Sequence, residues 1–236
     1  MAARSSGRHG GRDGSGRRPP AAPRLPSAWA PAPAAGPALA EEADFHRLDF
    51  RDLELAGRTA DGAAFEQCRF AGSDLSGVRL GGAIFTDCLF ENANLANVRA
   101  ERSALNRVRV GTSRLTGVHW INGSLRDVAF VECRLDLSSF RFSRCARVVF
   151  EGCNLTRADF QNADLSGTSF TRCDLTAAQF SQATMAGARF VNCTLAGIGG
   201  VTSLRGATVA PQDLAALSHT LAGALGIRIE NPADDD

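Results

Sequence analysis

Hydrophobic positions recur at every fifth residue along most of the chain. From Phe45 to Leu195 all 31 positions in this frame are apolar, and 13 of the 14 phenylalanines occupy it. A second column, two residues earlier, holds only Ala, Cys, Gly, Ser, Thr or Val from Ala63 to Cys193. A period of five matches neither a helix nor a strand, so it indicates a chain that turns a corner every five residues.

Four such corners close a square coil of about 20 residues. A third column, two residues after the large one, is rich in Gly, Asn and Asp, which tolerate the positive φ of tight turns. We therefore expect the large and small columns to face inward and the other three positions to face outward. Coils that stack as parallel strands, about 4.8 Å apart, make residues 45–203 a rod of about eight coils, roughly 40 Å long.

Several five-residue units carry a recognisable signature. Ser-Asp-Leu-Ser-Gly (73–77), Ala-Asn-Leu-Ala-Asn (93–97) and Ala-Asp-Leu-Ser-Gly (163–167) follow the pattern A-(D/N)-L-x-x. With these units the chain resembles the pentapeptide-repeat family, most closely its members of actinobacterial type. The resemblance implies an all-β fold, a right-handed quadrilateral β-helix, over about 45–205.

The predicted organisation has four segments. Residues 1–40 contain six arginines, one acid and otherwise mostly Gly, Ala, Pro and Ser, so we expect a disordered tail. The pair Arg17-Arg18 leaves an export or processing signal open, although prolines follow where an apolar stretch belongs. The β-helix is expected at 41–205, a capping or dimerisation helix with a short strand at 206–230, and an acidic tail at 231–236.

The cysteines form a column of their own. Four of them recur once per coil, which predicts a ladder on one side of the rod; they are Cys133, Cys153, Cys173 and Cys193. We interpret them as small core residues, with a metal or redox site as the alternative, because zinc sites normally use closely spaced Cys and His pairs. The four histidines are scattered and no nucleophile–base arrangement occurs. We expect no enzyme, no cofactor and no metal.

One outward region breaks the pattern. Leu137 and Phe142 occupy turn positions where Gly or Asn is usual, and exposed apolar groups that lie close together mark contact sites. A covering local loop is the alternative. From Arg99 to Arg157 there are eleven arginines against five acids, which favours an acidic partner at this level. The candidate partner surface therefore combines the two apolar residues with Arg134, Arg141, Arg144 and Arg147.

The C-terminal segment is predicted to be a helix. Pro211 suits a first helical position, Gly226 suits the cap, and four leucines recur on one helical face. The helix could cap the open end of its own rod or join two rods. A comparable ending forms the dimer contact in quinolone-resistance members of the family, so the resemblance implies a homodimer through Leu214, Leu217, Leu221, Leu225 and Ile227.

Two functional hypotheses follow. The first is an interaction scaffold that binds a protein partner. The second, from the resemblance, is a DNA mimic that binds DNA gyrase, a type II topoisomerase, and changes quinolone sensitivity. Residues 45–203 hold eighteen arginines and sixteen acids, whereas a DNA mimic needs a strongly negative face. Direct nucleic-acid binding is less favoured, since outward aromatic residues are few. No apolar run approaches the length that a membrane span needs, so we expect no such span. The cysteine usage suits a reducing compartment, so we expect a cytoplasmic protein.

Overall fold

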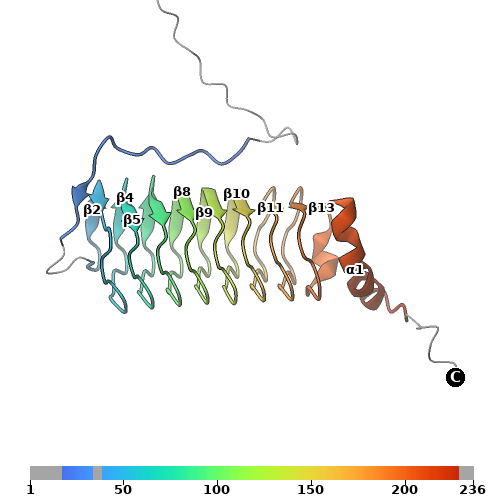
Figure 1. The fold of residues 1–236 in the computed structure, drawn as a ribbon. Helices are drawn as coiled ribbons and strands as arrows, with labels where there is room; N and C mark the ends of the chain where they lie inside the picture. Colours follow the sequence, from blue (N-terminus) through green and yellow to red (C-terminus); the bar gives the residue numbers. More distant parts are fainter. Residues whose placement is uncertain (1–17, 34–38, 229–236) are drawn as a thin grey trace, which may run out of the picture.

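The structure, a computed structural model, describes residues 18–33 and 39–228. It is a rod of parallel coils in which each strand pairs with the equivalent strand of the next coil, giving about nine turns and one C-terminal helix (Figure 1). The predicted all-β quadrilateral β-helix is thus confirmed. The acidic tail predicted at 231–236 lies outside the described residues.

The corners follow the predicted turn column. Every fifth residue from Glu42 to Gly197 has a positive φ, 32 positions in all, and 22 of them are not glycine. Non-glycine residues adopt this left-handed conformation at a cost of roughly 1–2 kcal/mol each. The ladder of backbone hydrogen bonds between coils and the buried core must therefore outweigh a strain that is repeated at every corner.

The four sides of the coil are named by their first core residue. The first side begins with Phe45, the second with Phe50, the third with Leu55 and the fourth with Ala60. The strands lie on the first two sides, with bounds β2 (Asp44–His46), β3 (Leu48–Asp49), β4 (Ala64–Glu66), β5 (Arg69–Ala71), β6 (Ile84–Thr86), β7 (Leu89–Glu91), β8 (Ala104–Gly111), β9 (Ser124–Val131), β10 (Arg144–Glu151), β11 (Ser169–Thr171) and β12 (Arg189–Val191).

The middle of the rod is built differently from its ends. Strands β8, β9 and β10 have eight residues and run across the corner between the first and second sides, whereas the neighbouring strands β7 and β11 have three. On the third and fourth sides the coils are joined by single bridges such as Glu54 to Asp74. The sequence did not predict the longer strands, because their residues keep the five-residue frame unchanged.

The core is a set of ring stacks. Phe50, Phe70 and Phe90 stack on the second side with centroids 4.6 Å apart, and Phe130 resumes this stack after Val110. The second column of rings lies on the first side up to Phe85 and on the fourth side from Phe140 onward. The change of side falls between Phe85 and Phe140, and Trp120 of the fourth side, whose ring centroid is 6.4 Å from that of Phe85, lies within this interval.

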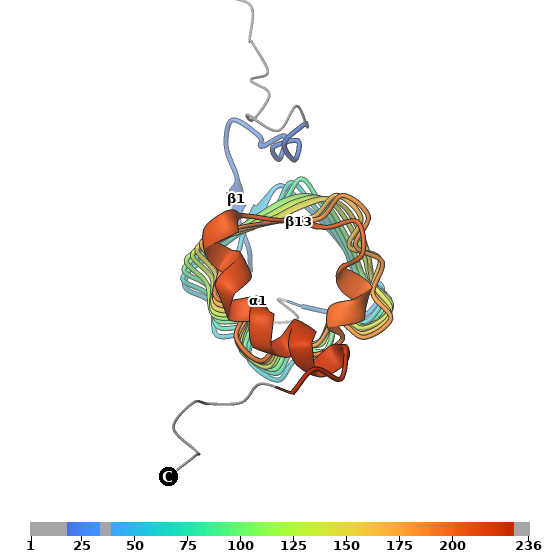
Figure 2. The ribbon, with the colours of Figure 1, turned by 90° about the vertical axis from the view of Figure 1, so that its right-hand side faces the viewer.

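The C-terminal end of the rod is closed by the last elements of the chain. A 3₁₀ turn (Val201–Leu204) and β13 (Thr208–Val209), which pairs with β12, continue the coil. Helix α1 (Pro211–Ala224) then lies across the open end, as the view along the rod shows (Figure 2). The helix begins at the proline that the sequence assigns to its first position.

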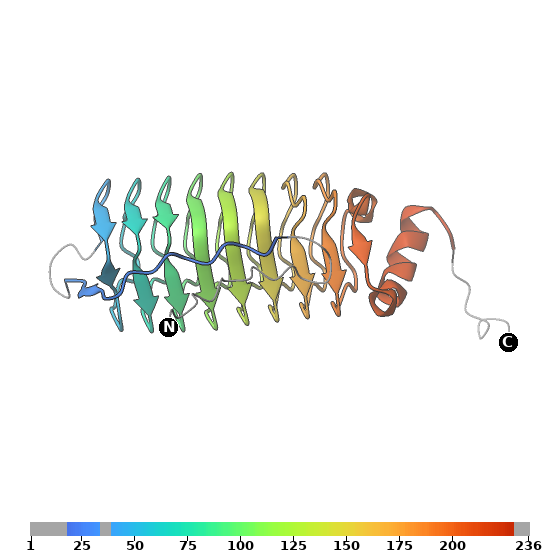
Figure 3. The same ribbon diagram turned by 90° about the horizontal axis from the view of Figure 1, so that it is seen from above.

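Residues 18–33, here called the strap, differ from the expectation of a disordered tail over 1–40. The strap lies extended along the rod, across β10, β9, β8 and the strands before them (Figure 3). It ends in β1 (Ala30–Pro31), which pairs in parallel with β3. Direct hydrogen bonds to the rod hold it, and composition alone does not reveal them. Residues 1–17 and 34–38 of the predicted tail lie outside the described residues.

Candidate interaction surfaces

The cysteine ladder is a packing feature. All seven cysteines are buried and free, and six thiols donate to the carbonyl oxygen 23 residues earlier, as Cys133 does to Val110 over 3.4 Å. The seventh, Cys145, takes a large core position, where burial raises the pKa of its thiol to about 12. Within the described ranges, no cluster of His, Cys, Asp and Glu could hold a metal ion.

Leu137 and Phe142 are both solvent-exposed, at 55% and 47%. They occupy successive corners with φ of 58° and 59°, so they flank the fourth side of one coil. The guanidinium of Arg141 lies over the Phe142 ring, 5.5 Å from its centroid, and is 3.7 Å from Asp159. These residues form the Leu137–Phe142 patch, an apolar pair beside a fixed cation.

The other arginines of the predicted surface are spread around the coil. Arg134 lies on the third side between Arg114 and Asn154, and Arg144 begins β10 on the first side. Arg147 lies at the corner between the first and second sides, with both its Nε and Nη2 at 2.6 Å from the carboxylate of Asp127. The structure therefore brings Arg141 to the patch and places Arg134, Arg144 and Arg147 on other sides.

Charge is sorted along the rod rather than onto one face. The outward column of the third side reads Glu54, Asp74, Asn94, Arg114, Arg134, Asn154, Asp174 and Thr194. That of the fourth side includes Arg79, Arg99, His119, Ser139 and Asp159 in this order. Acidic residues lie toward the ends of the third-side column, with arginines between them, whereas the fourth-side column has its arginines near the start of the rod and Asp159 further along. Neither column is the continuous negative surface that a DNA mimic requires.

Helix α1 places its apolar residues in two environments. Leu217 is 2% exposed and packs on the last coil, whereas Leu214, Leu221, Leu225 and Ile227 are 53%, 37%, 75% and 56% exposed. The buried carboxylate of Asp213 accepts the backbone N–H of Cys193 at 3.0 Å, so it satisfies a donor that the rod's last coil leaves free. The helix is thus a cap through Leu217 and Asp213, with an unpartnered apolar face.

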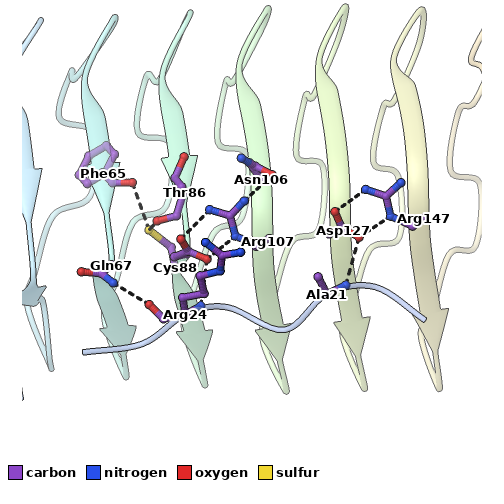
Figure 4. A network of polar contacts seen from close by, with 11 residues as sticks. Ala21, Arg24, Phe65, Gln67, Thr86, Cys88, Asn106, Arg107, Asp127 and Arg147 are labelled. Atoms are coloured by element: carbon purple, nitrogen blue, oxygen red, sulfur yellow. Dashed lines mark hydrogen bonds and ion pairs between the residues drawn. The ribbon is translucent and has the colours of Figure 1, made fainter. Parts of the chain in front are cut away.

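The strap meets the rod along the corner between the first and second sides (Figure 4). Asp87 Oδ1 accepts the N–H of Arg24 at 2.9 Å, and Asp127 Oδ1 accepts the N–H of Ala21 at 3.0 Å. Each carboxylate also holds the guanidinium one coil further on, Arg107 for Asp87 and Arg147 for Asp127. These two aspartates are 4% and 6% exposed, so the strap's N–H groups and the arginines satisfy charges that are buried.

The electrostatics of the two carboxylates agree with these contacts. Burial raises the pKa of Asp87, but hydrogen bonds from Arg107 and from the Arg24 N–H outweigh it, and the pKa lies below its usual value. The hydrogen bond from Arg147 is the main reason why the pKa of Asp127 is also lowered. Both groups therefore act as anions at neutral pH and hold the strap in that form.

Further along, the strap is fixed by an amide and an indole. Gln67 Nε2 donates to the carbonyl of Arg24, and Trp29 Nε1 donates to the carbonyl of Gln67, both at 2.8 Å. The guanidinium of Arg69 lies 5.7 Å from the Trp29 ring centroid. Sequence reasoning missed this site. The available signals were a lone tryptophan in the tail and the three-residue spacing of Pro20, Pro23 and Pro26.

Comparisons with known proteins identify the repeat. A family model described as a pentapeptide repeat region matches residues 83–160, and two further models of pentapeptide repeats match 150–197 and 49–87. No curated protein sequence matches the chain significantly. The part of the chain that the structure describes contains no helix that is long and apolar enough to cross a membrane.

Solved structures of pentapeptide-repeat proteins resemble the chain at low sequence identity. Full-length QnrB1, a plasmid-mediated fluoroquinolone resistance protein, is 18% identical over 77% of this chain and 91% of its own, with a TM-score of 0.36. HetL, a pentapeptide repeat protein involved in heterocyst differentiation regulation in the cyanobacterium Nostoc sp. strain PCC 7120, is 16% identical over 71% of this chain and 85% of its own, with a TM-score of 0.35.

Proposed function

Since the chain belongs to the pentapeptide-repeat family, we propose that it is a non-enzymatic scaffold: a rigid rod that presents side chains to a protein partner. The observation that carries the proposal is the Leu137–Phe142 patch, two large apolar side chains left exposed on a rod whose other large apolar residues are mostly buried. Rings stacked along the core and parallel backbone pairing give the rod the stiffness of a solenoid, which holds outward residues at fixed spacing.

The patch has the chemistry of a contact site. Large exposed apolar groups beside an arginine are typical of the centre of protein interfaces, where aromatic residues and arginine are enriched. Arg141 lies over the Phe142 ring and 3.7 Å from Asp159, and its Nε has no hydrogen-bond partner in the described part of the chain, so it offers a donor to a partner at this place. The surrounding arginines of the middle coils favour an acidic partner.

The patch is tested by binding to a purified partner. A protein captured by the wild-type chain is purified and titrated against wild type, a Leu137→Ser/Phe142→Ser variant, and an Ile84→Ser control. Ile84 is 49% exposed on β6, away from the patch, so its replacement removes a large exposed apolar side chain outside the patch. We expect at least a tenfold weaker affinity for the double variant alone. Equal affinities for all three chains would contradict the role of the patch.

We further propose that α1 joins two rods. Its apolar residues other than Leu217 are exposed, and Leu214, Leu221 and Leu225 fall within about 40° of one another around a helix of 3.6 residues per turn. Light scattering tests this pairing: Leu221→Arg should give a monomer, and Ala216→Arg, on the opposite side of the helix, should leave a dimer. A monomeric wild type would refute the pairing.

The alternative is a protein that binds DNA gyrase and changes quinolone sensitivity. The charge pattern argues against it, because arginines interrupt the outward columns of the third and fourth sides. A supercoiling assay with purified gyrase, with and without a quinolone, separates the two functions. The scaffold proposal predicts no inhibition and no protection at micromolar protein, and either effect would favour the alternative.

A further inference from the structure

The strap is held by its main chain, at a regular interval. Its two donors to the rod's carboxylates, the N–H groups of Ala21 and Arg24, are three residues apart. Prolines occupy positions 19, 20, 23 and 26, and a proline-rich segment favours the polyproline II conformation, with three residues per turn and about 3.1 Å per residue. One turn is therefore about 9.3 Å, and both N–H groups face the same way.

The rod repeats its acceptors at the same interval. Asp87 and Asp127 lie two coils apart in one corner column. Parallel strands are about 4.8 Å apart, so the two carboxylates are separated by about 9.6 Å along the rod. One polyproline II turn thus spans two coils, with a mismatch of about 0.3 Å.

The surface beside the acceptors is largely apolar, with one arginine in it. Successive outward positions of the second side hold Leu89, Arg109, Ala129 and Val149. Leu89 is 9% exposed where the strap crosses the rod, whereas Ile84, at the same position on the first side, is 49% exposed. Pro19, Pro20 and Pro23 line an open cavity of about 280 Å³ together with the apolar Ala129 and Val149 and with the charged Arg109, Asp127 and Glu151.

We propose that this corner is a binding track for proline-rich, polyproline II peptides, and that the strap is its intramolecular occupant. The external partner is a protein segment with free N–H groups three residues apart and prolines at other positions, as in Pro-Pro-x-x-Pro-x, where the third and sixth residues donate. The carboxylates of Asp87 and Asp127 accept hydrogen bonds from the backbone N–H groups, and the apolar outward residues of the second side contact the prolines. The track is separate from the Leu137–Phe142 patch, so this proposal does not depend on the role proposed for the patch.

The strap competes with any external peptide. A tethered segment has an effective concentration in the millimolar range, so it masks the track from peptides at micromolar concentration. Weakening the strap should therefore raise the affinity for an added peptide. The full chain allows this without changing the rod, because Ala21→Pro/Arg24→Pro removes both donors and preserves the polyproline II preference.

The control variant is Ala22→Pro/Leu25→Pro, which adds the same two prolines at N–H groups that donate no hydrogen bond to the described part of the chain. The probe is a fluorescein-labelled peptide with the sequence of residues 18–33, and fluorescence anisotropy measures its affinity. A shorter probe with the sequence of residues 18–26 lacks Trp29 and β1, so it tests the proline-rich part alone.

We expect both probes to bind the Ala21→Pro/Arg24→Pro chain at least tenfold more tightly than the wild-type and control chains. Peptides with proline at positions 21 and 24 should bind that chain at least tenfold more weakly than peptides with proline at 22 and 25. Equal affinities for the two kinds of peptide, or no binding, would overturn the proposal. Unchanged protease resistance of the strap in the Ala21→Pro/Arg24→Pro chain would also overturn the proposal, because it would show that the two hydrogen bonds do not hold the strap on the rod.

Discussion

Removing one ring from the middle of a stack should cost much of the protein's stability. Phe160 is fully buried and stacks on Phe140 and Phe180, each 5.3 Å away between centroids, with edge contacts to Phe150 and Phe170. Phe→Ala changes in cores cost about 3–5 kcal/mol, and ring pairs contribute about 0.5–1.5 kcal/mol each beyond their burial. The coils above and below are fixed by backbone pairing, so the cavity cannot collapse.

We therefore expect Phe160→Ala to lower the free energy of unfolding by about 4–5 kcal/mol. Phe142→Ala is the matched control, since this ring is 47% exposed at a corner, and it should cost less than about 1 kcal/mol. Phe45→Ala, with two ring contacts at the end of the rod, should lie between them. Urea unfolding followed by circular dichroism measures all three. Equal losses for Phe160→Ala and Phe142→Ala would show that the inward column does not form the core.

Three further predictions concern the strap, a close approach and the thiols. The pKa values of Asp87 and Asp127 are lowered in the folded chain, so the stability that the two carboxylates contribute is present at neutral pH and is lost as the pH falls below about 4. The tryptophan emission of a Trp120→Phe chain should then shift, because Trp29 of the strap is released. Gly200→Ala should lower the urea midpoint more than Gly197→Ala does: both have positive φ, but only at Gly200 would a Cβ run into the backbone of Ser181. The buried thiols should react with a disulfide reagent only on unfolding, and fast labelling of the native chain would contradict their place in the core.

The repeat was predictable because every coil buries the same kinds of side chain at the same positions. Phe160 and Phe170 are buried for the reason expected from the pattern, which places a large apolar group at the centre of every side. Positive φ at every corner follows from the same frame, and it holds even where Leu137 or Phe142 stands in place of glycine. A periodic pattern determines such features locally, without knowledge of any distant residue.

The strap was not predictable by the same route. Its position on the rod comes from a few hydrogen bonds between segments that are 63 and 106 residues apart, and a polyproline II segment shows no internal pairing pattern. Asp87 and Asp127 look in the sequence like any outward carboxylate. The arginines and prolines of the strap, with only Leu25 and Trp29 as large apolar residues, favoured disorder, because composition does not reveal the hydrogen-bond acceptors that the rod supplies.

The match between strap and rod has a consequence for how the gene can change in length. A solenoid tolerates the gain or loss of whole coils, because every new coil finds an equivalent neighbour. The gain or loss of one coil between Asp87 and Asp127 would move one carboxylate by about 4.8 Å along the rod, which is half a polyproline II turn. The backbone N–H that donates to this carboxylate would then point away from it. The contacts of the strap with Gln67 and β3 extend the same constraint toward the start of the rod. Duplication and deletion of coils are therefore penalised from β3 to Asp127 and tolerated beyond it, so the strap fixes the number of units in this interval.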